Sequence, residues 1–261
     1  MANTGAKAVQ VASLGRLHLA RYTSYLPGEA DARALPDAHF VATHGADAVD
    51  VQWPGAAPAD HHFASVVAKH LLGLRNSLNQ EMPFAIDSLR LRVILIPDGF
   101  RYAKTANRVF SGNHVSAEFA VRAGSHREQS MRLAVRDVAH ELMHAIFSIN
   151  GISSKAKEAD GGSLEEEAIY TTENCIELRV IGSTAGDPLS SQSRRFDASR
   201  LGPTSATTSL VSGQRVDTAL GGLFAPGSPP ITADDPRAET LHSLCRQAIA
   251  RLMAGARSRV E

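Results

Sequence analysis

The chain has 261 residues, an apolar fraction of 43% and a formal net charge of zero. This length and apolar content suffice for one large domain, or for one compact domain with appendages. Because the charges balance, no overall field favours nucleic acid or an anionic membrane, and we expect neither as a partner.

Cysteine content and targeting signals narrow the class of protein further. Cys175 and Cys245 are too few for a disulfide framework and lack Cys-x-x-Cys spacing, so we expect imidazole and carboxylate to hold any metal. Residues 1–20 do not read as a Sec signal peptide, and no run of about 18 apolar residues occurs. We therefore expect no membrane span. The protein is expected in the cytoplasm, or exported or delivered to another cell by a route that needs no Sec signal.

The first half of the chain predicts a helix and two strands. Residues 1–60 are rich in Ala, Gly, Pro and Asp and show no sustained period, which predicts a weakly ordered region. Asp60 is an N-cap type of residue before a helical pattern that continues to Leu78. Strands are predicted at 89–96 and at 114–122, where apolar and polar residues alternate.

The second half predicts three helices and one long loop. Apolar residues recur at helical spacing from Met131 to Ile146, and a second helix is predicted from about Ser163 to Val180. Its opening, Ser163 followed by Glu166, matches a capping box. Cys175 falls on the apolar stripe of that helix and is expected to be a small core residue.

These elements predict an α+β fold in four parts. The parts are a weakly ordered N-terminal region (1–60), a central core (61–180), a loop-rich segment that is a lid or a disordered arm (181–235), and a C-terminal helix (236–261).

The segment from His140 to His144 is an H-E-x-x-H motif in the middle of a predicted helix. Residues four apart share a helix face, so His140 and His144 can reach one ion. Glu141 is then placed to act as general base toward a water molecule activated by Zn²⁺. The uncharged residues that flank the motif are typical of a buried metal helix.

A catalytic zinc ion needs a third protein ligand, and three consecutive glutamates, Glu165–Glu167, open the next helix. All three are open as candidates by residue type. Glu165 is in register with the apolar residues Ile169 and Ile176, and that face is expected to pack against the motif helix. We therefore expect Glu165 to bind the metal and the other two glutamates to face solvent.

The motif helix followed by the acidic segment Leu164–Ile169 resembles the gluzincin metallopeptidases. Within these, Thr172-Glu173-Asn174 is similar to the signature of bacterial effector and toxin-associated peptidases, relatives in a broad sense of clostridial neurotoxin light chains and type III secreted zinc proteases. The resemblance covers about residues 89–180. It implies a zincin-like fold, in which a small mixed sheet packs against the metal helix and a Glu-bearing helix. The small residue Ala168, three positions after Glu165, agrees with Glu165 as the ligand.

The resemblance implies a zinc metallopeptidase, a hydrolase that acts on a protein or peptide substrate. It also implies that the strand from Val115 to Val121 is an edge strand that aligns the substrate by β-augmentation. Two other functions remain open: a non-catalytic interaction protein with a structural or vestigial metal site, and a metal-dependent amidohydrolase with a non-peptide substrate. The sequence specifies no oligomeric state.

Further residues are candidates by type alone. Glu173 or Asn174 is suited to orient a ligand imidazole. The groups of a type that stabilises an oxyanion are Tyr170, Arg179, Arg194, Arg195, His126 and His242.

Overall fold

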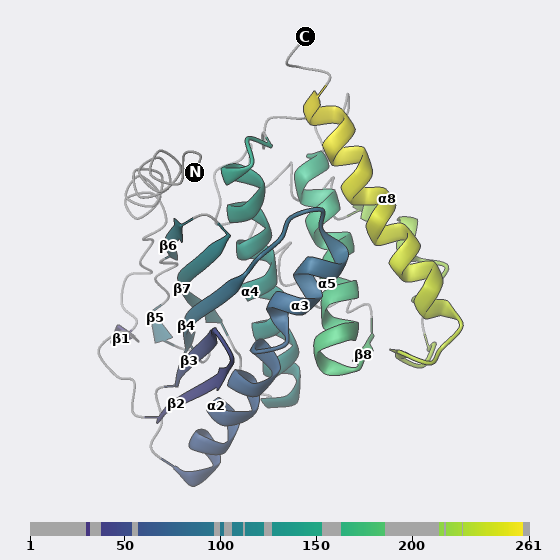
Figure 1. Cartoon of the computed structure of the whole chain (residues 1–261). Coiled ribbons are helices and arrows are strands. Elements are labelled where there is room, and N and C mark those ends of the chain that lie inside the picture. The colour runs from purple at the N-terminus through teal and green to yellow at the C-terminus, as the bar shows by residue number, and fades with distance from the viewer. Residues whose placement is uncertain are drawn as a thin grey trace. The chain divides into compact units, whose positions relative to one another are not determined.

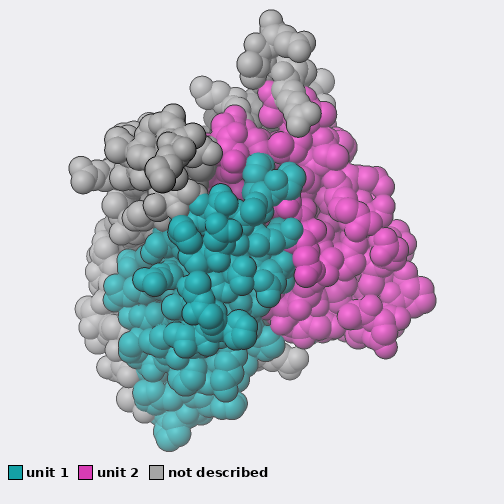
Figure 2. Space-filling model, viewed as in Figure 1, with its two compact units in different colours: residues 1–79, 83–142 teal, residues 80–82, 143–261 magenta. Residues whose placement is uncertain are grey.

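A computed structural model of the chain describes residues 30–31, 38–53, 57–96, 100–101, 106–111, 113–122, 127–152, 163–185, 214–216, 218–225 and 227–257. It combines helices with a small mixed sheet, so the α+β class predicted from the sequence is confirmed (Figure 1). The chain divides into two compact units (Figure 2): residues 1–79 and 83–142 form unit 1, and residues 80–82 and 143–261 form unit 2.

Unit 1 is built on a five-stranded mixed sheet. In spatial order its strands are β2 (Ala38–His44), β3 (Asp47–Trp53), β4 (Ser88–Ile96), β7 (His114–Arg122) and β6 (Ala106–Ser111). The three central strands run parallel, and the two outer strands are antiparallel to their neighbours. A separate parallel pair joins β1 (Ala30–Asp31) to β5 (Phe100–Arg101).

Strands β4 and β7 confirm the two strands predicted from the sequence. Along the first part of β4, Leu89, Leu91 and Val93 are at most 3% exposed, whereas Arg90 and Arg92 between them are exposed. This alternation gives the sheet one core face and one polar face.

Residues 38–53 differ from the expectation of a weakly ordered region, because β2 and β3 form a hairpin within it. Gly45 has a φ of 59° and supplies the left-handed residue of the turn between His44 and Asp47. Val49 and Val51 are at most 1% exposed and face the core. Each strand is only seven residues long, and small residues mask its period.

The expectation that the strand from Val115 to Val121 lies at a sheet edge is wrong. β7 pairs with β4 on one side and with β6 on the other, so it is an interior strand. Among the described strands, β2 and β6 hold the two edges of this sheet. Order along the chain does not predict this position, because β6 precedes β7 and returns beside it.

The predicted helix from Asp60 to Leu78 is two helices, α2 (Pro58–Leu71) and α3 (Leu74–Glu81). Asp60 lies in the first turn of α2, where its carboxylate accepts hydrogen bonds from the Ala57 backbone and the Trp53 indole at 3.1 Å each. α2 packs against β2 and β3.

Unit 2 is centred on α5 (Leu164–Ile181), which packs against α8 (Arg237–Arg257). α5 begins after Ser163, whose hydroxyl accepts a hydrogen bond from the Glu166 backbone, so the predicted N-cap is confirmed. The helix ends at Gly182, which has a φ of 86°. α8 confirms the predicted C-terminal helix.

Most of the predicted loop-rich segment at 181–235 lies outside the described residues. Two short strands at its ends, β8 (Ser183–Thr184) and β9 (Ile231–Thr232), pair in antiparallel fashion. None of the helices among the described residues is both long and apolar enough to cross a membrane.

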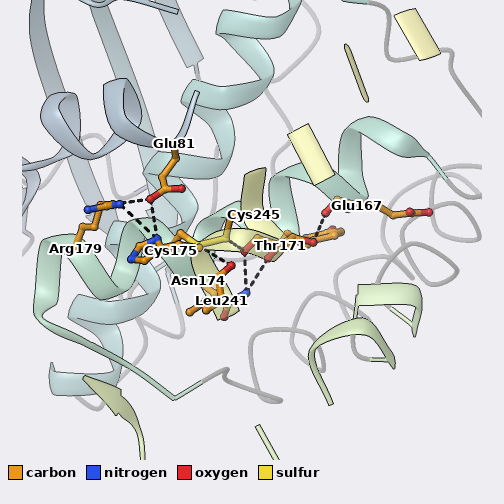
Figure 3. Close-up of a disulfide and its surroundings, with 10 residues drawn as sticks. Glu81, Glu167, Thr171, Asn174, Cys175, Arg179, Leu241 and Cys245 are labelled. Carbon is orange, nitrogen blue, oxygen red and sulfur yellow. Dashed lines mark hydrogen bonds and ion pairs between the residues drawn. A yellow bond between two sulfur atoms is a disulfide. The ribbon is translucent and has the colours of Figure 1, made fainter. Parts of the chain in front are cut away.

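A disulfide joins Cys175 on α5 to Cys245 on α8, a pairing that the sequence analysis does not predict, and the expected core position of Cys175 is confirmed (Figure 3). Both residues are fully buried within a core cluster built from the two helices and the segment around residues 216–224. The two cysteines are 70 positions apart in the sequence, and the packing of α5 on α8 brings them together.

Candidate metal centre

The H-E-x-x-H motif lies within α4 (Arg127–Ile149), as predicted. His140 and His144 are one turn apart on this helix, and the boundary between the two units falls between them, after Leu142. The apolar neighbours of the motif are at most 3% exposed, and Glu141 is 7% exposed. His144 keeps 24% of its side chain accessible. The motif is therefore a partly open polar site with buried apolar neighbours.

The imidazole of His144 lies between two consecutive carboxylates from the start of α5. Its Nδ1 is 2.6 Å from Oε1 of Glu165, and its Nε2 is 3.3 Å from Oε1 of Glu166. The hydrogen bond from the Glu166 backbone to Ser163 fixes the first turn of α5. Each ring nitrogen of His144 thus faces its own carboxylate.

His140, His144 and Glu166 form a group suited to hold a metal ion. One potential ligand atom from each of the three side chains lies within 4.8 Å of the other two. Two imidazoles and one carboxylate are the ligand set of many catalytic zinc sites, which keep a fourth position open. The residues present therefore fit zinc by the chemistry of their donor atoms.

The electrostatic environment of His144 favours positive charge. Burial lowers the pKa of His144, but the negative charge of Glu166 and the hydrogen bonds that the imidazole donates to Glu165 and Glu166 outweigh it, so the pKa lies well above 6.5. The same two carboxylates attract a divalent cation. Because an imidazole must lose its proton to bind a metal, metal and proton compete for this ring.

The glutamate run divides differently from the expected pattern. Glu166, not Glu165, belongs to the group with both histidines, while Glu165 lies on the Nδ1 side of His144. The expectation that Glu167 faces solvent is wrong, since it is 6% exposed and 2.9 Å from the guanidinium of Arg215. The prediction that Glu165 binds the metal stays a prediction.

The residues predicted to assist the centre lie in several places. Arg179 and His242 both contact Glu81 near the far end of α5, and Tyr170 packs against the core cluster of unit 2. Asn174 donates hydrogen bonds to two backbone carbonyls of its own helix, and Glu173 is fully buried. The other candidates, His126, Arg194 and Arg195, lie outside the described residues.

The sequence signal that bears on Glu166 is Ser163. As the predicted N-cap of α5, Ser163 fixes which residues occupy the first turn of that helix. It does not fix which of them turns toward α4, because that depends on how the two helices meet.

No protein-family model matches the chain, and comparison with the curated proteins finds no match either.

Proposed function

We propose that the chain is a zinc-dependent peptidase with a zincin-like core, in which His140, His144 and Glu166 hold the metal. The observation that carries this proposal is that one potential ligand atom from each of these side chains lies within 4.8 Å of the other two. The two histidines lie on α4, which also carries Glu141, and Glu166 lies on α5. When bound, zinc polarises a substrate carbonyl and lowers the pKa of a water molecule to about 7.

The two glutamates before Glu167 have different roles in this proposal. Glu166 is the third ligand, because its carboxylate faces Nε2 of His144 and groups with His140. Glu165 accepts a hydrogen bond from Nδ1 of the same imidazole, at 2.6 Å. Such a contact fixes the tautomer that leaves Nε2 free to bind a metal and raises the basicity of the ring. Glu165 is therefore a positioning residue.

Glu141 is the proposed general base. It follows His140 directly and is 7% exposed, so its carboxylate is largely shielded from bulk water. In peptide hydrolysis it takes a proton from the attacking water and returns it to the leaving amine nitrogen. A purely structural metal site has no need of a carboxylate at this position.

Of the two predicted locations, the cytoplasm and a place reached by export, the disulfide supports export. Disulfides form and persist in oxidising compartments and are rare in the cytosol. A peptidase that acts outside the cell or in another cell agrees with the resemblance to effector and toxin-associated enzymes. The protein or peptide substrate would then be met after export.

The direct test is proteolysis of a mixed proteome by the wild type and by Glu141→Gln, with new peptide termini counted by mass spectrometry. We expect the variant to retain its zinc and to lose about 100-fold or more of its activity. Glu239→Gln is the control, because the side chain of Glu239 is 81% exposed on α8. Equal turnover in the wild type and Glu141→Gln would exclude this mechanism. A zinc-loaded wild type that produces no new termini would favour the non-catalytic alternative.

A further inference from the structure

A second group of ligand-type side chains surrounds the disulfide in unit 2, away from the H-E-x-x-H motif in sequence (Figure 3). Glu81, at the end of α3, has no exposed side-chain surface. Its Oε1 accepts from Arg179 on α5 at 2.5 Å and lies 2.9 Å from Nδ1 of His242 on α8. Three helices thus contribute charged or titratable groups around the buried carboxylate of Glu81.

Metal-ligand atoms of Glu81, Cys175 and His242 all lie within 4.8 Å of one another. Cys245 adds a fourth donor, because its sulfur is bonded to that of Cys175. His242 and Cys245 are three residues apart on α8, so they share one face of that helix. The group therefore offers two sulfurs, one imidazole and one carboxylate.

A second observation agrees with a cation at this place. The Oε2 atom of Glu81 is buried and has no hydrogen-bond partner. Buried carboxylate oxygens normally accept a hydrogen bond, and leaving one without a partner destabilises the folded state. A metal ion would occupy the lone pairs of this carboxylate.

We propose that reduction of the Cys175–Cys245 disulfide creates a second metal site, formed by the two thiolates, His242 and Glu81, for a zinc-like divalent cation. In the reducing step a dithiol gives two electrons and two protons to the disulfide and becomes a cyclic disulfide itself. The S–S bond breaks and two thiols form. Binding of the cation then releases both thiol protons to solvent.

Charge balance favours this site in both redox states. In the disulfide state the carboxylate of Glu81 is neutralised by the guanidinium of Arg179. In the reduced state the two thiolates neutralise the divalent cation, and the Glu81–Arg179 pair remains neutral. Since buried net charge is strongly unfavourable, a site that stays neutral in both states is physically reasonable. Thiolate, imidazole and carboxylate together select zinc over magnesium or calcium.

The two states exclude each other, because the same sulfur atoms make either the disulfide or the metal bonds. Whether this site can bind a metal ion therefore depends on whether the compartment that holds the protein is reducing or oxidising. In a reducing compartment the chain would carry a cation here, and in an oxidising one it would carry the disulfide.

The test is metal titration of the full chain purified either with or without a dithiol reductant, in the His140→Ala/His144→Ala background that removes the motif histidines. Co²⁺ is the probe, because a thiolate ligand gives it a charge-transfer absorption that nitrogen and oxygen ligands do not. We expect one equivalent with that absorption in the reduced protein and none in the oxidised protein. The same titration of the wild type shows whether the first site is present, so the two proposals can fail separately.

The matched variants are His242→Ala, which keeps the disulfide, and His61→Ala, which replaces an exposed histidine on α2. The reduced His242→Ala protein should bind Co²⁺ at least 10-fold more weakly, and His61→Ala should match its parent. Circular dichroism checks that each protein is folded. The proposal is overturned if the reduced, folded protein shows no thiolate absorption. It is equally overturned if the reduced protein is unfolded and Co²⁺ does not restore its fold.

Discussion

Two consecutive glutamates, Glu165 and Glu166, contact opposite ring nitrogens of His144. On a helix, neighbouring residues point about 100° apart, so they reach the same imidazole only if the ring lies between their directions. Glu165 and Glu166 do so because Ser163 holds the first turn of α5. The imidazole is thereby restrained at both ring nitrogens.

The first prediction separates the ligand from the positioning residue. Glu166→Gln removes a proposed ligand, whereas Glu165→Gln removes only the hydrogen-bond acceptor at Nδ1. We expect Glu165→Gln to weaken zinc binding by about 10- to 100-fold, the usual effect of such a partner, and Glu166→Gln to weaken it by more. Competition with a chromophoric chelator measures both, with Glu239→Gln as the exposed control. The reverse order of effects would make Glu165 the ligand, as the sequence pattern favoured.

The motif was predictable because H-E-x-x-H needs only local helical geometry. The orientation of the glutamates at the start of α5 was not, because its prediction relied on an apolar stripe along this helix. In the structure Thr172, Glu173 and Asn174 are at most 2% exposed, so this helix is buried on nearly every side. When a helix has no solvent-exposed face, its sequence has no amphipathic pattern, and the pattern cannot predict which side faces a neighbouring helix.

Among the elements, sequence periodicity located those with one solvent face or strict alternation. α8 keeps Leu241, Cys245 and Leu252 fully buried on one side, and it was predicted within a few residues. The β2–β3 hairpin and the break between α2 and α3 were missed. Strands this short contain too few repeats of the apolar–polar alternation to be recognised. A break of two residues is too short to interrupt a helical pattern visibly.

The second prediction concerns the start of α8. Hydrogen bonds from the side chain and the backbone of Arg237 lower the pKa of Asp235. A lowered folded-state pKa stabilises the fold fully above the ordinary carboxyl pKa of about 4, and this stability is lost as pH falls through the folded pKa. Asp235→Asn should therefore reduce stability at neutral pH and flatten its loss below about pH 4. Urea unfolding at several pH values measures this, and an unchanged pH profile would contradict it.

The third prediction tests the packing of α5. Ile176 is fully buried, and Ile176→Ala should lower the free energy of unfolding by about 2–5 kcal/mol through lost burial and a cavity. Val41→Thr is the control, because Val41 is 50% exposed and such changes usually stay within about 0.5 kcal/mol. Chemical denaturation gives both values. Equal effects would show that α5 is not packed as described.

For the molecule as a whole, the motif helix belongs to both compact units, since their boundary follows Leu142. Both motif histidines lie on α4, so helical geometry alone sets their spacing. The sequence predicted the fold class and the motif but not this division, which depends on contacts far apart in the chain.

The fourth prediction concerns the disulfide as a constraint on the whole chain. It closes a loop of 70 residues, for which chain entropy predicts about 4 kcal/mol of stabilisation. With a chelator present, the reduced protein should unfold at lower denaturant concentration than the oxidised protein, by about that free energy. The Cys175→Ser/Cys245→Ser double variant should behave like the reduced protein and be insensitive to reductant. No difference between the redox states would contradict this role.

The measurement that tests the central claim most directly is anomalous X-ray scattering at the zinc absorption edge, from crystals of the purified, oxidised full chain. The account predicts a peak at the H-E-x-x-H motif, with nitrogen atoms of His140 and His144 and a carboxylate oxygen of Glu166 about 2.0–2.2 Å away. A peak ligated by Glu165 instead of Glu166 would contradict the assignment of the third ligand. Absence of any peak at the motif in zinc-supplemented crystals would contradict the metal centre itself.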